Sequence, residues 1–143
     1  MVIMVIDGQG GGIGKSIIEK LKTRIRPTDK IIAVGTNSTA TASMMKSGAS
    51  AAATGENAIV VNARRADIIA GSIGIISSNA MYGELTSKMA EAISESNAEK
   101  VLIPIKKCGL NVVGVSIDAL PKLIDEAVDM ICGFLQADQK TGC

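Results

Sequence analysis

The chain has 143 residues, of which 47% are apolar, so it is long enough to form one domain with a hydrophobic core. Its formal net charge of +1 argues against nucleic acid or an anionic membrane as the main partner. Because the chain has no histidine, a Ser-His-Asp triad and a histidine-ligated metal site are excluded.

Three further features indicate where the protein works. No apolar run approaches the roughly 20 residues that span a bilayer. The N-terminus lacks the basic region of a signal peptide. The cysteines (Cys108, Cys132 and Cys143) are odd in number and irregularly spaced, which suits reduced thiols. We therefore expect a cytoplasmic protein with no membrane partner.

The first predicted elements are a strand, a glycine-rich turn and a helix. Residues 2–6 are an apolar run, and five glycines follow within seven residues: Gly8, Gly10, Gly11, Gly12 and Gly14. Isoleucine and leucine then recur at helical spacing as far as Ile25, and the helix should stop near Arg26-Pro27. This arrangement aims backbone N–H groups and a helix N-terminus at a phosphate. Glycine is needed because a side chain would block the ligand or forbid the turn.

The spacing of these glycines decides which motif they form. The P-loop pattern fails by one position, because Gln9 stands where its first glycine should be. A strict G-x-G-x-x-G also fails, since Ile13 occupies the place of the third glycine. The sequence fits Gly8-x-x-x-Gly12-Ile13-Gly14, which resembles the dinucleotide loop of short-chain dehydrogenases. The alternative is a turn whose glycines only let helix and strand pack closely.

The side chains beside the loop leave alternatives open. Lys15 and Ser16 lie in the first helical turn, and both could contact a phosphate. The alternative is that Lys15 is solvated and that Ser16 bonds to an unpaired N–H group of the helix. Asp7 would repel a phosphate, so it either holds Mg²⁺ or accepts hydrogen bonds from the loop's own N–H groups. We favour the second role for Asp7 and expect no metal.

The second predicted strand, residues 30–34, ends at residues 35–38. In dinucleotide folds this position carries an acidic residue for a ribose 2′-OH or an arginine for a 2′-phosphate, and Gly35-Thr36-Asn37-Ser38 offers neither. Short polar donors such as Asn37 could serve a phosphate. We therefore prefer NADP slightly over NAD, and another nucleotide, including a mononucleotide, stays open. The expected ligand-binding residues are Gly8, Gly10, Gly11, Gly12, Ile13, Gly14, Lys15, Ser16 and Asn37.

Helix-like and strand-like stretches alternate through the rest of the chain. We expect helices at 39–47, 56–66, around 85–93 and from Asp118 as N-cap through 131, and strands at 49–53, within 68–76, at 101–105 and at 111–115. The alternation predicts an α/β fold: a three-layer, Rossmann-like, doubly wound and mostly parallel sheet of five to six strands. Residues 1–135 should form the single domain, with 136–143 as a frayed tail. The expected core is Val2, Ile3, Val5, Ile32, Val34, Ile69, Ile75, Val101, Ile103 and Val113.

Open α/β sheets bind ligands at the carboxyl ends of their strands, where three further candidates lie. Glu56 is either a general base or a complement to its helix dipole, and we favour the second. Cys108, beside Lys106 and Lys107, is either an activated nucleophile or an ordinary thiol, and we favour the ordinary thiol. Tyr82 and Lys88 lie six residues apart rather than the four of the dehydrogenase pair, so that activity is not carried over.

Taken together, the stretches at residues 7–15, 35–37, 53–62 and 103–105 resemble a family of short uncharacterised bacterial proteins. The resemblance implies a Rossmann-like fold and a cytoplasmic bacterial setting, with no established activity. We favour a nucleotide-binding protein, and the alternative is an oligomeric regulatory or structural module with a ligand-free scaffold. A mean hydropathy of +0.32 and a long aliphatic last helix also predict a homo-oligomer, most simply a dimer.

Overall fold

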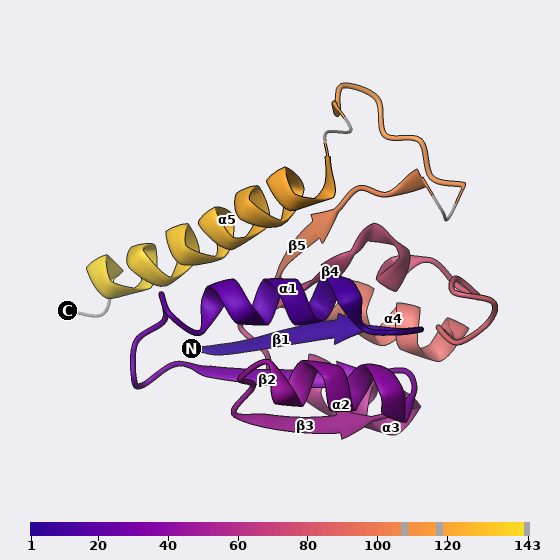
Figure 1. Cartoon of the computed structure of the whole chain (residues 1–143), viewed down its shortest axis with the longest axis horizontal. Helices are drawn as coiled ribbons and strands as arrows, with labels where there is room; N and C mark the ends of the chain where they lie inside the picture. The colour runs from indigo at the N-terminus through magenta and orange to yellow at the C-terminus, as the bar shows by residue number, and fades with distance from the viewer. Residues whose placement is uncertain (107–108, 117–118, 142–143) are drawn as a thin grey trace.

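The structure is a computed structural model that describes residues 1–106, 109–116 and 119–141. Strands and helices alternate along it (Figure 1). The elements, in chain order, are β1 (Val2–Asp7), α1 (Gly12–Leu21), β2 (Lys30–Gly35), α2 (Ser38–Lys46), β3 (Ala51–Thr54), α3 (Glu56–Ala63), β4 (Ile68–Ser72), the 3₁₀ helix η1 (Ile73–Ile76), α4 (Ser87–Glu95), β5 (Glu99–Ile103) and α5 (Leu120–Thr141).

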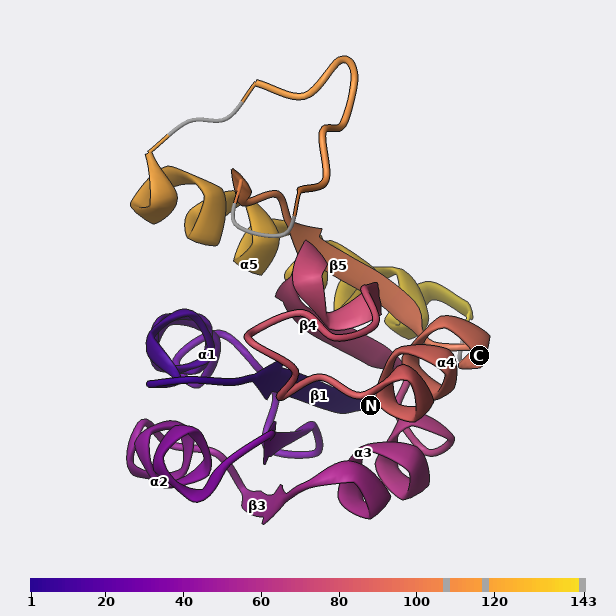
Figure 2. The same cartoon turned by 90° about the vertical axis from the view of Figure 1, so that its right-hand side faces the viewer.

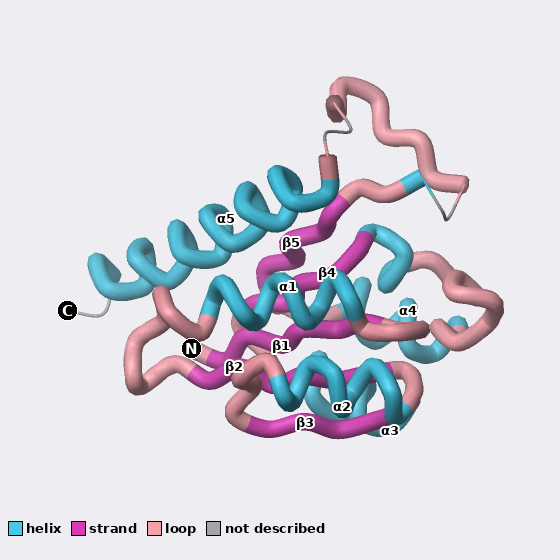
Figure 3. The backbone as a smooth tube through the Cα atoms, in the orientation of Figure 1, coloured by secondary structure: helices cyan, strands magenta, loops and turns pink. Residues whose placement is uncertain are grey.

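The five strands form one parallel sheet in the order β3-β2-β1-β4-β5. In register, Val2 lies opposite Lys30 of β2, and Ile3 lies opposite Ile68 of β4. Helices α1, α2 and α5 cover one face of the sheet and α3 and α4 cover the other (Figures 1 and 3). The predicted three-layer α/β fold is confirmed, with five strands rather than six.

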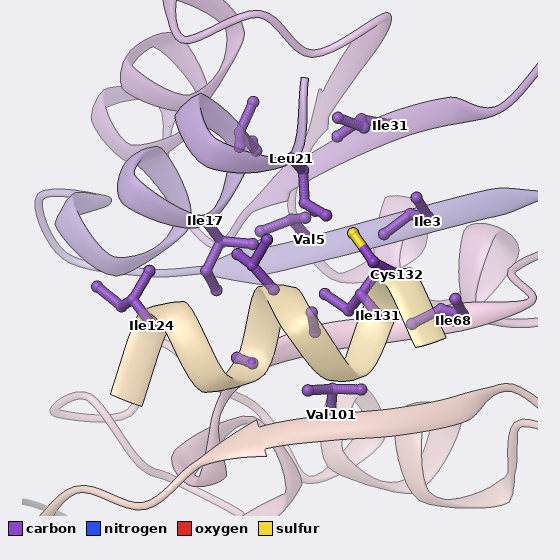
Figure 4. Packing of buried hydrophobic residues seen from close by; sticks show 14 of the residues in the cluster. Ile3, Val5, Ile17, Leu21, Ile31, Ile68, Val101, Ile124, Ile131 and Cys132 are labelled. Carbon is purple, nitrogen blue, oxygen red and sulfur yellow. The ribbon is translucent and has the colours of Figure 1, made fainter. Parts of the chain in front are cut away.

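The core lies on both faces of the sheet because successive side chains of a strand point to opposite sides. Along β1, Ile3 and Val5 pack under α1 and α5, whereas Met4 and Ile6 pack under α3 and α4, and all four are fully buried. Figure 4 shows the first of these clusters, in which α5 closes over the sheet. Burial on both faces explains why the strands read as continuous apolar runs rather than as alternating ones.

The predicted sixth strand at residues 111–115 is wrong. These residues form turns and irregular structure, with a positive φ at Gly114. Val113, expected in the core, is 99% exposed. Valine favours strands only where a neighbouring strand packs against it, and the described residues supply none here. Of the other expected core residues, Val2 and Ile32 are only partly buried, and the remaining seven are buried.

Several predicted boundaries differ from the observed ones. α1 ends at Leu21, before Arg26-Pro27, because the chain then turns through hydrogen bonds that end at Asp29. α3 ends at Ala63 rather than at residue 66. β4 ends at Ser72, where η1 begins. α5 continues to Thr141, so residues 136–141 of the expected tail are helical in the structure. The expected N-cap Asp118 lies outside the described residues.

A helix long and apolar enough to cross a bilayer is not found among the described segments.

Candidate functional site

A cleft opens at the carboxyl ends of β1 and β4. In the sheet, β2 lies on one side of β1 and β4 lies on the other. The loops that follow β1 and β4 therefore diverge at this point. Parallel sheets bind ligands where the strand order reverses in this way. The cleft has a volume of about 740 Å³. It is lined by Asp7, Gly8, Gln9 and Ile13 after β1, by Ser72 and residues 77–82 after β4, and by Ile105 after β5.

Asp7, at the base of the cleft, is 8% exposed and bonds to the loop that follows it. Its Oδ1 accepts a hydrogen bond from the N–H of Gly8 and its Oδ2 accepts one from the N–H of Gly14, both at 2.7 Å. The pKa of Asp7 is raised because its burial outweighs these hydrogen bonds, which by themselves lower the pKa. The capping role favoured from the sequence is confirmed. The positive end of α1 is therefore partly neutralised by the chain's own carboxylate.

Three loop glycines are required by packing within the chain. A Cβ on Gly8 would collide with the sulfur of Met81 and lie 2.6 Å from the Thr36 hydroxyl. Gly11 has a φ of +74°, and its Cβ would lie 2.9 Å from the backbone of Ala40. A Cβ on Gly14 would collide with the buried side chain of Met44. The packing alternative therefore accounts for these three positions without a ligand.

Packing among the described residues does not require a glycine at Gly10 or Gly12. A Cβ on either would meet no atom within 4 Å. Both residues are exposed, and neither backbone N–H donates a hydrogen bond within the described part of the chain. These two N–H groups are the donors of the loop that an anionic ligand could still use.

Lys15 and Ser16 lie at the start of α1 but do not line the cleft. The side chain of Lys15 is 52% exposed, and its Nζ lies 4.0 Å from Glu19, one turn along the helix. The hydroxyl of Ser16 donates to the carbonyl of Gly12 at 3.0 Å. Ser16 therefore bonds a helix carbonyl, so the alternative in which it pairs with an unpaired N–H group of the helix is wrong.

Asn37 joins the loops after β1 and β2. Its Oδ1 accepts a hydrogen bond from the N–H of Ala40, which caps α2, at 2.8 Å. Its Nδ2 donates to the carbonyl of Gln9 at 2.9 Å and to Oε1 of Glu84 at 2.5 Å. Asn37 is thus fully engaged by neighbouring groups of the chain.

Glu84 is a site residue that the sequence analysis missed. Besides Asn37, its Oε1 accepts from the Thr36 hydroxyl at 2.8 Å and from the N–H of Gln9 at 3.0 Å. The hydrogen bond from Asn37, helped by the other two, lowers the pKa of Glu84. No local pattern signals this contact, because Gln9 and Glu84 lie 75 residues apart in the sequence.

Ser72, the last residue of β4, is the second residue that the sequence analysis missed. It is 4% exposed and lines the cleft. No hydrogen bond joins its hydroxyl to another described residue. Since no fully buried side-chain N or O atom of the described residues lacks a partner, this hydroxyl is open to the cleft. A hydroxyl that is open to the cleft can pair with water or with a bound molecule, so Ser72 offers a hydrogen-bonding group to a ligand there.

The loop between η1 and α4 supplies the other wall of the cleft. Three of its non-glycine residues have a positive φ: Asn79 (65°), Met81 (58°) and Tyr82 (56°). Such conformations cost free energy and concentrate at functional sites. Tyr82 is completely exposed and is not part of a helix, so it does not form a dehydrogenase-like pair with Lys88.

The remaining candidates lie away from the cleft. Glu56 accepts a hydrogen bond from the Thr86 hydroxyl at 2.6 Å, which links α3 to the start of α4. Cys132 is free and buried in α5, and burial raises the pKa of its thiol. Lys106 is exposed, whereas Lys107 and Cys108 lie outside the described residues. Residues 1–106, 109–116 and 119–141 contain no group of three or more acidic or cysteine side chains that could hold a metal.

The model of a family described as a domain of unknown function, DUF3842, matches residues 2–136. The chain belongs to this family. DUF3842 membership covers all five strands and every residue that lines the cleft. It confirms the expected membership of an uncharacterised family, whereas the likeness of the glycine loop to short-chain dehydrogenases stays a prediction. None of the curated proteins matches the chain.

Proposed function

We propose that the protein binds a nucleotide in the cleft between the loops after β1 and β4. The observation that carries this proposal is the cleft itself, which lies where the strand order reverses and is lined by the Ser72 hydroxyl, a group that pairs with no described residue. The cleft volume of about 740 Å³ lies within the usual range for sites that enclose a small molecule.

The ligand's phosphate would bind at the start of α1. Gly10 and Gly12 are exposed residues that adjoin Gln9 and Ile13 of the cleft lining without lining it themselves. Their N–H groups donate no hydrogen bond within the described chain, and a helix N-terminus favours negative charge. Of the described residues that line the cleft, none is a lysine or an arginine. Backbone donors and hydroxyl groups would therefore carry the phosphate. NADP, NAD and mononucleotides are the ligand classes that this chemistry fits.

A second candidate function is an oligomeric regulatory or structural module with no ligand. The position of Asp7 favours it, because a buried carboxylate already accepts the N–H groups of Gly8 and Gly14. The same charge repels an incoming phosphate. The two functions differ in whether any nucleotide stabilises the folded protein.

The test is a thermal-shift and calorimetric screen with AMP, GMP, CMP, UMP, NAD and NADP. A ligand at about 100 times its Kd should add about 2.7 kcal/mol to the free energy of unfolding. Ser72→Ala should weaken binding by about 0.5–1.5 kcal/mol, the usual worth of one hydrogen bond. Gly12→Val should abolish it without unfolding the protein, since a side chain there meets only open space.

Gly133→Val is the matched control, because Gly133 lies exposed on α5 and its Cβ also meets open space. This variant should bind the nucleotide as the wild type does. A screen in which no nucleotide raises the melting temperature would favour the ligand-free module instead.

Two further proposals about the protein's setting rest on the sequence, and a third rests on the structure. The cysteine pattern and the family resemblance support a cytoplasmic, bacterial protein. A net charge of +1 supports a partner other than nucleic acid. Exposed apolar side chains after β5 support a homodimer.

A further inference from the structure

The cleft lies on one side of the glycine loop only. Its lining comes from the loops after β1, β4 and β5, and none of Thr36, Asn37 and Glu84 is part of it. A ligand that extended from this cleft to the end of β2 would have to cross the glycine loop. We infer that Met81 and Glu84 close that path, so that the site takes a mononucleotide and excludes a dinucleotide. This inference rests on the proposed nucleotide-binding function.

Glu84 occupies the donors on the β2 side of the loop. Its Oε1 accepts hydrogen bonds from the N–H of Gln9, the Thr36 hydroxyl and the Asn37 amide, at 2.5–3.0 Å. A dinucleotide would need these groups for its second phosphate or ribose. It would also meet the negative charge of Glu84, which those hydrogen bonds stabilise.

Met81 closes the path directly above the loop. Its sulfur lies so close to Gly8 that a Cβ on that glycine would collide with it. On the β2 side, the Asn37 amide bonds to the carbonyl of Gln9 at 2.9 Å, which draws the two loops together. A bridging pyrophosphate would have to displace the Met81 sulfur or break this hydrogen bond.

The segment that carries both residues is held in shape by its own backbone. The N–H of Asn79 donates to the carbonyl of Leu85 at 2.7 Å, and the N–H of Leu85 donates to the carbonyl of Ala80 at 3.2 Å. Glu84 itself donates its N–H to the carbonyl of Met81 at 3.1 Å. Moving this segment aside for a longer ligand would break several hydrogen bonds at once, each with a free-energy cost.

The experiment measures the Kd values of AMP, GMP, CMP, UMP, NAD and NADP by titration calorimetry with the wild-type chain. We expect at least one mononucleotide to bind about tenfold or more tightly than both dinucleotides. The double variant M81A/E84A opens the path, so its ratio of dinucleotide to mononucleotide affinity should rise by about tenfold. M45A/E91A is the matched control, since Met45 and Glu91 are exposed on α2 and α4, and its ratio should equal that of the wild type.

The possible failures are distinguishable. NAD or NADP binding as tightly as the best mononucleotide would overturn this inference and leave nucleotide binding intact. An unchanged ratio in M81A/E84A, with the variant folded by circular dichroism, would overturn the role of Met81 and Glu84. Binding of none of the six nucleotides would remove the proposed function and this inference with it.

Discussion

Glycine is required in the loop after β1 for reasons that differ from residue to residue. At Gly11 the backbone itself demands it, because φ is +74° and a Cβ would lie 2.9–3.3 Å from the backbone of Ala40. At Gly12 none of the described residues demands it, because a Cβ there would meet open space. A glycine-rich motif therefore contains residues that the fold requires and residues that leave space for a ligand. Only the three-dimensional structure shows which glycines are of which kind.

Gly11→Ala and Gly12→Ala should consequently have opposite effects on stability. An alanine in the left-handed region costs about 1–2 kcal/mol, and its contact with Ala40 adds to this, so Gly11→Ala should lower the free energy of unfolding by about 2 kcal/mol or more. Gly12→Ala should leave it unchanged or raise it by up to about 1 kcal/mol, because alanine is the better helix former. Urea unfolding of both variants measures the difference. Equal losses would contradict the packing reason given for Gly11.

Between elements, the turn from α1 to β2 is fixed by one buried carboxylate. Asp29 is 5% exposed and accepts hydrogen bonds from Nε and Nη2 of Arg26 at 2.8 and 2.7 Å. Arg26 also lies 3.7 Å from Asp138 near the end of α5. The hydrogen bonds from Arg26 hold the pKa of Asp29 well below its ordinary value. A single side chain thereby joins the turn to the last turns of α5.

Asp29→Asn should lower the free energy of unfolding by about 1.5–3 kcal/mol at pH 7, the usual worth of hydrogen bonds to a charged group. Because the pKa of Asp29 is lowered by folding, its ionised form stabilises the protein above the unfolded-state pKa. This stabilisation is lost as the pH falls below about 4. Denaturant unfolding between pH 7 and pH 3 measures the gap in the free energy of unfolding between the wild type and the variant, which should narrow as the pH falls. A gap that stays constant or widens toward pH 3 would contradict this assignment.

The elements differ in how far the sequence could predict them. β1 and β2 are apolar runs bounded by glycine or a turn, and α1 has helical spacing, so their own residues define them. Residues 111–115 have the same strand-forming valines, but strand formation depends on a neighbour that only the tertiary structure supplies or withholds. The site follows the same rule: Asp7 and the glycine loop are local, whereas Glu84 reaches them from the loop before α4.

At the scale of the whole molecule, the last helix does not serve the purpose expected from its sequence. The apolar stripe of α5, including Ile124, Val128 and Ile131, is buried against the chain's own sheet (Figure 4). It therefore leaves no long aliphatic face for a second subunit. The exposed apolar side chains gather instead around residues 109–116, which loop away from the sheet (Figure 2).

We name these side chains the valine patch: Leu110, Val112, Val113, Val115, Leu120 and Met130, each at least 36% exposed. Beside the patch, a cleft of about 380 Å³ between β5 and α5 is lined in part by Val112, Val115 and Met130. Several exposed apolar side chains gathered on one segment and the helix that follows it are typical of a site of association. A two-fold dimer is the simplest way to cover it, because the same patch then serves both subunits.

Val113→Asp tests this proposal, since Val113 is 99% exposed and a charge there costs the monomer little. Light scattering of the wild type at micromolar concentration should give twice the chain mass of 14.7 kDa, and the variant should give the single mass, because an unpaired carboxylate in an apolar interface is strongly unfavourable. Met45→Asp is the control: Met45 is 46% exposed on α2, outside the patch, so this variant should remain dimeric. A monomeric wild type would refute the dimer, and a dimeric Val113→Asp would exclude the valine patch as its interface.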